Sequence, residues 1–351
     1  MPIQSRRMRV LVDRHQADLF RAMQRLFEGR LGLEVWTPMG HEWWDEGIWR
    51  FGECFGDDRL ARQYLLPDAR HLERSDGSWI TYDTAHPNVP IRCTSLRRAR
   101  AMRDWRFVVA TVQENQPGFR RFADEQGAGY VVQVGNTGQR IQWDLDPAVI
   151  SSSEMPILGR GVVARQEFDS GPDGAFGFLE PHRADRSTVR SFVNLLHRIP
   201  QAWADFSAAE RALASDGFSF HEHGHEGRDG IVQPTAGIAR LMAASGWGWH
   251  DKPVGDGFGH VVHGWAAVGR PLVGHSEYYR GKLAEPFWDD LVTCIDLSAR
   301  SIDQAIDLMR EISEDPARHA QMCRAIRARF DGAVDYDTDE ARIRTLLGLE
   351  R

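Results

Sequence analysis

The chain has 351 residues, of which 42% are hydrophobic and 26% charged, and its formal net charge is −7. This length and apolar content predict roughly two domains, each with its own core. Its four cysteines are scattered, no secretory signal is present, and no apolar run approaches the roughly 20 residues that span a bilayer, so we expect a cytoplasmic protein with no membrane partner.

The first half alternates short apolar strands with amphipathic helices, as parallel sheets covered by helices do. Strands are predicted at residues 8–12, 33–36, 79–83, 107–112 and 130–134. Helices are predicted at residues 16–32, 95–102 and 117–127, and Gly32 would end the first of them. These elements predict a doubly wound, Rossmann-like domain over residues 1–165.

A Gly-, Ser- and Asp-rich stretch at residues 168–177 is typical of a linker, and a second alternating series follows it. Its strands are expected at residues 189–194, 218–224, 247–250, 270–275 and 291–296. Its helices are expected at residues 234–246, 259–269 and 301–312, and Gly246 would end the first. We predict a second Rossmann-like domain over residues 166–335, and a helix within residues 336–351 that packs back on the first domain. The two domains would face each other across a cleft.

The stretch from Gly255 to His275 reads GDGFGHVVHGWAAVGRPLVGH. Gly257 and Gly259 allow a close approach of the backbone, and the helix that begins near His260 would offer free N–H groups and a positive dipole to an anion. The pattern predicts a binding site for an anion such as a diphosphate.

This stretch resembles the donor-binding signature of GT-B glycosyltransferases, where a glycine-rich turn opens a helix that is followed by Gly-x-Pro and a strand. Together with WGWHDKP (residues 247–253) and EYYRGKLAEPF (residues 277–287), it is similar to a bacteriophage branch of that superfamily. LVDRHQADLF, VGNTGQ and SFVN elsewhere in the chain resemble that branch too. The resemblance implies an α/β GT-B fold, a UDP-sugar as co-substrate and no required metal or cofactor.

One departure from the signature concerns an acidic pair. Retaining members of the superfamily commonly carry two acidic residues separated by seven positions, of which the second binds the nucleotide ribose. Asp256 matches the first, but the second position holds Gly264, one residue after His263. Ribose recognition must therefore differ, and neither retention nor inversion of configuration follows from the resemblance.

Lysine occurs only at positions 252 and 282, on either side of the glycine segment. A leaving diphosphate needs cations and N–H donors when no divalent metal is present, so we assign Lys252, Lys282 and the nearby Arg280 to the donor site. Solvated surface side chains are the alternative. The other donor-site candidates are Asn194, His250, Phe258, His260 and His263. A local backbone contact is the alternative for each histidine, and turn formation is the alternative for Asn194.

The stretch HEHGHEGRDG (residues 221–230) is the most metal-like in the chain. His221 and His223 would share one face of a strand, with His225 and Glu226 following. Nothing here has the closed two-plus-two spacing of a structural zinc site, and the glycines favour a flexible loop beside the donor. We therefore expect no metal site.

Polar residues near the strand ends of the first domain are the catalytic candidates. His15 follows the first strand, where it could contact the acceptor or take its proton. Asp18, Asp83 and Glu114 supply carboxylates, one of which could act as the general base of an inverting reaction. Helix capping is the alternative for Asp13 and His15.

The resemblance implies two acceptor classes, hydroxymethylated pyrimidines in phage DNA and residues of virion proteins, and we favour DNA. Arg97 and Arg100 share helical spacing and could bind phosphates, although the first domain is near-neutral and a solvated helix is the alternative. Trp43 and Trp44 could form an aromatic surface beside an exposed base, or a buried cover over the sheet. The remaining acceptor candidates are His86 and Asn136.

Two further functions fit the same pattern. A nucleotide-sugar epimerase of this fold would act on the donor without any acceptor. A non-catalytic module that binds nucleic acid or glycan would use the same site without turnover.

Overall fold

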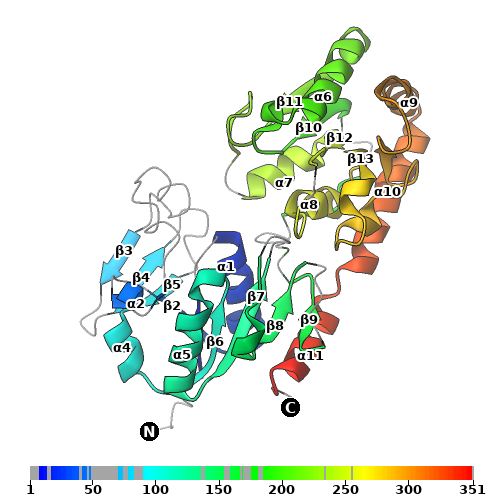
Figure 1. Cartoon of the computed structure of the whole chain (residues 1–351). Helices are drawn as coiled ribbons and strands as arrows, with labels where there is room; N and C mark the ends of the chain where they lie inside the picture. The colour runs from blue at the N-terminus through cyan, green and yellow to red at the C-terminus, as the bar shows by residue number, and fades with distance from the viewer. Residues whose placement is uncertain are drawn as a thin grey trace. The chain divides into compact units, whose positions relative to one another are not determined.

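The computed structural model describes residues 8–13, 17–38, 42–45, 47–48, 70–73, 78–82, 90–135, 139–153, 159–166, 168, 175–180, 185–232, 235–253 and 256–349. The chain forms two compact units, Met1–Glu167 with Tyr336–Arg351, and Phe168–Asp335. Each unit has its own sheet (Figure 1). Each also has its own core of buried side chains. Within the described ranges, no helix is both long enough and apolar enough to cross a bilayer.

The first unit is built on one sheet. Its strands are β1 (Arg9–Val12), β2 (Glu34–Pro38), β3 (Arg70–Glu73), β4 (Ser78–Tyr82), β5 (Pro90–Thr94), β6 (Trp105–Ala110), β7 (Gly129–Val134), β8 (Ala148–Ser151) and β9 (Gly161–Val163). They form a nine-stranded sheet in the order β3-β4-β5-β2-β1-β6-β7-β8-β9. Neighbouring strands from β5 to β9 are parallel, whereas β4 is antiparallel to β3 and β5. The strand order reverses between β1 and β6.

Helices cover this sheet because each has one apolar face. They are α1 (Ala17–Gln24), which continues into a π-helical turn at Arg25–Arg30, α2 (Glu42–Asp45), α4 (Leu96–Ala101), α5 (Gln116–Gln126) and α11 (Tyr336–Leu346). Gly32 adopts a φ of 72°, which ends the first helical segment. From the C-terminal segment, Ile343 and Leu347 lie in the same core cluster as Phe27. Arg30 also pairs with Asp337 at 3.0 Å.

The second unit carries a smaller sheet that is parallel throughout. Its strands are β10 (Asp185–Ser191), β11 (Ser219–Glu222), β12 (Ser245–Trp249), β13 (Leu272–Gly274) and β14 (Cys294–Asp296), in the order β11-β10-β12-β13-β14. The helices are α6 (Pro200–Leu213), α7 (Thr235–Ala243), α8 (His260–Val268), α9 (Ile302–Glu314) and α10 (Pro316–Ala333). Phe206, Trp249 and Met309 belong to its core. Here the order reverses between β10 and β12, so ligands are expected beside the carboxyl ends of those strands.

The predicted fold class is confirmed, because each unit is a mostly parallel sheet with helices, as in the Rossmann-like domains of the GT-B fold. Among the strands, the differences lie in the first sheet. The strand predicted at residues 79–83 is the antiparallel β4, and β3, β5, β8 and β9 were not predicted. These strands are short, and polar residues interrupt the apolar pattern of β3 and β5. A prediction based on apolar runs therefore misses them.

Gly246 does not end a helix as predicted. Helix α7 ends at Ala243, and Gly246 lies inside β12. A Cβ atom at this position would come within 2.6 Å of the Arg186 Cα atom on the neighbouring strand. The glycine is therefore explained by the close approach of two backbones.

Candidate functional site

The carboxyl edge of the second sheet brings two loops together. His250 directly follows β12, and Gly274 is the last residue of β13. A Cβ atom on Gly274 would lie 2.2 Å from the carbonyl oxygen of His250, so only glycine allows this approach. The loop that carries His250 and Lys252 is thereby fixed next to the end of β13.

Asp256 is bound from both sides by residues of this loop. Nε2 of His250 lies 3.0 Å from Oδ2 of Asp256, and Nζ of Lys252 donates to Oδ1. Burial would raise the pKa of the Asp256 carboxyl, but the hydrogen bond from His250 and the charge of Lys252 outweigh it and hold that pKa below its ordinary value. Asp256 is therefore ionised at any working pH and fixes the position of the Lys252 ammonium group.

The glycine turn then opens helix α8. Gly259, the N-cap residue, has φ 82° and ψ 51°, a left-handed conformation that favours glycine, and no side chain caps the helix. The ring of Phe258, which is buried, stacks on His263 at 4.2 Å between centroids and holds the turn against the helix. The first N–H groups of a helix have no acceptor inside it, so this end of α8 can receive an anion.

Lys282 reaches the same place from the segment after β13. Its Nζ lies 5.9 Å from the centroid of the Tyr279 ring. Partial burial and the neighbouring Lys252 lower the pKa of Lys282, while the charge of Asp256 opposes that shift. The charges of Asp256 and Lys252 therefore act on Lys282.

The structure thus brings together the largest part of the predicted donor set. These residues are His250, Lys252, Asp256, Gly257, Phe258, Gly259, His260, His263 and Lys282. Two ammonium groups and a helix N-terminus are groups that can bind a diphosphate. Arg280 is exposed two residues before Lys282, and its role stays a prediction.

Asn194 and the histidine-rich stretch lie beside the ends of β10 and β11. Oδ1 of Asn194 accepts a hydrogen bond from the backbone N–H of His225 at 2.8 Å, so this side chain orders the loop. His223 is 7% exposed, and burial lowers its pKa. Among the described residues, no group of three His, Cys, Asp or Glu side chains is arranged to hold a metal ion.

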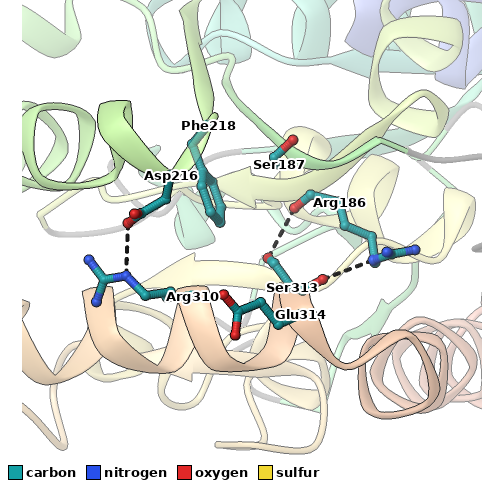
Figure 2. A pocket seen from close by; sticks show the side chains of 7 residues that line it. All are labelled: Arg186, Ser187, Asp216, Phe218, Arg310, Ser313 and Glu314. Atoms are coloured by element: carbon teal, nitrogen blue, oxygen red, sulfur yellow. Dashed lines mark hydrogen bonds and ion pairs between the residues drawn. The ribbon is translucent and has the colours of Figure 1, made fainter.

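A pocket of about 280 Å³ lies at the opposite, amino-terminal edge of the same sheet (Figure 2). Arg310 pairs there with Asp216 at 2.8 Å, and Nε of Arg186 donates to the Ser313 carbonyl at 2.9 Å. The residues that line it are Arg186, Ser187, Asp216, Phe218, Arg310, Ser313 and Glu314. None of the predicted donor residues is among them, so we keep the donor at the carboxyl edge.

An ion pair at the carboxyl edge predicts a pH-dependent stability. Nδ1 of His275 lies 2.7 Å from Oδ1 of the buried Asp251. This hydrogen bond, opposed by burial, raises the pKa of His275 above its ordinary value of 6.5. The stabilisation is therefore complete below the unfolded pKa and is lost as the pH rises through the folded pKa. We expect the wild-type chain to melt at a higher temperature than His275→Gln, and we expect this difference to be larger at about pH 6 than at about pH 9. An equal difference at both pH values would contradict a charged pair.

The first unit has a buried carboxylate that the sequence analysis did not select. Asp13 follows β1 at the point where the strand order reverses, and it is 2% exposed. Its Oδ2 accepts hydrogen bonds from the N–H groups of Thr111 and Val112 and from Nδ2 of Asn115. Burial raises the pKa of Asp13 to about 6, although these hydrogen bonds lower it. The position of Asp13 directly after a buried strand was the sequence signal for a functional carboxylate. Helix capping also explained an aspartate at that position, so the sequence did not single it out.

Most of the predicted catalytic and acceptor residues cannot be placed. His15, Asp83, His86 and Asn136 lie outside the described residues, as do the side chains of Asp18 and Trp44. Glu114 is exposed in a short turn after β6, at the carboxyl edge of the first sheet. Its catalytic role stays a prediction.

Trp43 corrects one part of the acceptor prediction. The side chain is 1% exposed, Nε1 donates to the carbonyl of Thr94 at 2.9 Å, and the ring meets Phe122 edge-on. Assigning Trp43 to an acceptor-binding surface was wrong, because a buried indole cannot stack on a base; the alternative of a buried cover holds. Arg97 and Arg100 are both exposed on α4, and Arg100 pairs with Glu125 near the end of α5, so their role in acceptor binding stays a prediction.

Comparison with solved structures finds proteins of the same fold. The Anabaena protein HepE in complex with UDP matches with a TM-score of 0.61 at 10% identity, over 98% of this chain and 100% of that chain. The pneumococcal O-GlcNAc transferase GtfA with UDP and GlcNAc matches with a TM-score of 0.56 at 10% identity, over 97% and 99%. An alpha-glucosyltransferase bound to UDP and a 13-mer DNA matches with a TM-score of 0.61 at 9% identity, over 97% and 100%.

Because the sequence identity is so low, these similarities establish the fold alone. The chain has the GT-B fold, and the resemblance of the glycine segment to GT-B proteins is confirmed at that level. No family model and no curated protein matches the sequence.

Proposed function

We propose that this protein is a glycosyltransferase that moves a sugar from a UDP-sugar to a hydroxymethylated pyrimidine base in DNA. The convergence of Lys252, Lys282 and the N-terminus of α8 at the carboxyl edge of the second sheet carries this proposal. Diphosphate groups bind where backbone N–H groups and cations meet. UDP in the structures of HepE and GtfA, which share the fold, supports a uridine nucleotide as the donor.

The proposed reaction breaks the bond between the sugar's anomeric carbon and the diphosphate oxygen. Negative charge then grows on the leaving UDP, where Lys252, Lys282 and the α8 N-terminus stabilise it more than they stabilise the intact donor. The acceptor hydroxyl loses its proton and forms the new bond to the anomeric carbon. In the proposal, His15 or one of the carboxylates Asp18, Asp83 and Glu114 receives that proton.

DNA is the proposed acceptor because of two structures of the same fold. The alpha-glucosyltransferase was solved with UDP and DNA, and in one complex the DNA contains an HMU base. The protein would have to expose such a base to reach its hydroxymethyl group. A phage origin is part of this proposal.

Nucleoside mass spectrometry tests the proposal. DNA containing 5-hydroxymethylcytosine or 5-hydroxymethyluracil is incubated with the protein and a panel of nucleotide sugars, then digested to nucleosides; DNA without hydroxymethyl groups is the control. We expect the mass of one sugar to be added to the hydroxymethylated base with one donor only. If the donor is cleaved but the DNA stays unmodified, virion proteins become the favoured acceptor. If the donor stays intact under every condition, the protein is not a transferase.

A further inference from the structure

Tyr279 places a buried hydroxyl group beside the glycine turn. The side chain is 0% exposed, and its Oη has no hydrogen-bond partner among the described residues. The ring stacks on Trp288 at 4.9 Å between centroids and lies 5.9 Å from the ring of His250. Nζ of Lys282 lies over the same ring. A Cβ atom on Gly259 would come within 3.9 Å of the Tyr279 Cε1 atom, so the phenol borders the N-cap of α8.

The charges around Tyr279 keep its hydroxyl protonated. Burial, together with the carboxylates of Asp256 and Asp251, raises the pKa of the phenol well above its ordinary value. The group is therefore a neutral hydrogen-bond donor at any working pH.

A buried hydroxyl without a partner destabilises the free protein, because it gives up its hydrogen bonds to water and gains none. His250 has the same feature: its side chain is 1% exposed and Nε2 binds Asp256, but Nδ1 has no partner in the part of the chain that the structure describes. Two polar groups on neighbouring rings thus lack a partner among the described residues, close to a helix N-terminus and two lysines. A ligand that completes their hydrogen bonds would explain why these buried groups have no partner within the protein.

We propose that Tyr279 is a further donor-binding residue, whose hydroxyl donates a hydrogen bond to an oxygen of the donor's diphosphate. This rests on the proposed function for the identity of the ligand. The hydroxyl adds a neutral donor to the charged groups Lys252 and Lys282. Its fixed position, set by the stack on Trp288 and the contact with His250, orients the diphosphate against the start of α8.

The test compares Tyr279→Phe with Tyr278→Phe, which removes the same atom from the adjacent, partly exposed tyrosine. Melting temperature without ligand and calorimetric titration with UDP and with inorganic pyrophosphate are measured for both variants and the wild-type chain. We expect Tyr279→Phe to melt at or above the wild-type temperature, and to bind both ligands about 10- to 100-fold more weakly. Tyr278→Phe should bind both as the wild type does.

Each contrary result has a distinct meaning. Wild-type affinity in Tyr279→Phe would overturn the inference and leave the proposed function intact. A lower melting temperature of the ligand-free variant would also overturn it, because the hydroxyl would then have a partner within the protein. Binding of pyrophosphate but not UDP by the wild-type chain would contradict the uridine donor, while the variant's loss of pyrophosphate binding would still support Tyr279. If the wild type binds neither, both are overturned.

Discussion

Arg270→Met is expected to destabilise the second unit by about 3–5 kcal/mol. Arg270 is 0% exposed, although it carries a guanidinium group, and it lies directly after helix α8. This group donates to four backbone carbonyls, those of Leu179, Ala243, Val268 and Gly269, at 2.6 to 3.1 Å. Methionine fills a similar volume but leaves these buried acceptors without donors, and each unpaired acceptor costs free energy.

Thermal unfolding measures this effect. A loss of that size corresponds to a melting temperature lower by roughly 10 °C for a unit of this length. Arg329→Met is the matched control, because Arg329 pairs with Asp289 at 2.7 Å on the exposed surface and should be replaceable without a resolvable change. Arg270→Lys is expected to recover little, since one ammonium group cannot reach carbonyls on separate segments. If Arg270→Met melts at the wild-type temperature, the four carbonyls find other donors and the prediction is wrong.

The parts of the site that could be predicted are those encoded locally. Gly259, the first turn of α8 and the strand after it lie within one short segment, and their conformations follow from the residues themselves. Lys252 and Lys282 could be predicted because lysine is so rare in this chain. Neither inference requires knowledge of how distant segments pack.

The parts that were missed depend on distant segments. Arg270 lies inside the recognised glycine segment, yet its role is set by carbonyls near residues 179 and 243. The hydroxyl of Tyr279 is significant only because packing buries it without a partner. The prediction for Trp43 was wrong for the same reason. The surrounding segment is rich in tryptophan, but the indole packs against Phe122 and donates to Thr94, which are distant in the sequence.

Lys252→Ala and Lys282→Ala are each expected to lower kcat about 10²- to 10³-fold, the loss typical of removing one group that stabilises a developing negative charge. Because the charge on the departing UDP is greater in the transition state than in the bound donor, kcat should fall more than KM rises. Folding should be little affected, since the side chain of Lys252 is 44% exposed and its ion pair with Asp256 is partly solvated.

Turnover with the best donor and acceptor, together with UDP affinity, separates the possible functions. The variants Lys252→Arg and Lys282→Arg are the controls, because they keep the charge and should retain part of the activity. Undiminished turnover in both alanine variants would contradict the diphosphate assignment. If the wild-type chain shows no turnover and the variants change affinity alone, the protein is a binding module. Conversion of the free nucleotide sugar without an acceptor would instead identify an epimerase, since the same two lysines would then stabilise a UDP that never leaves the site.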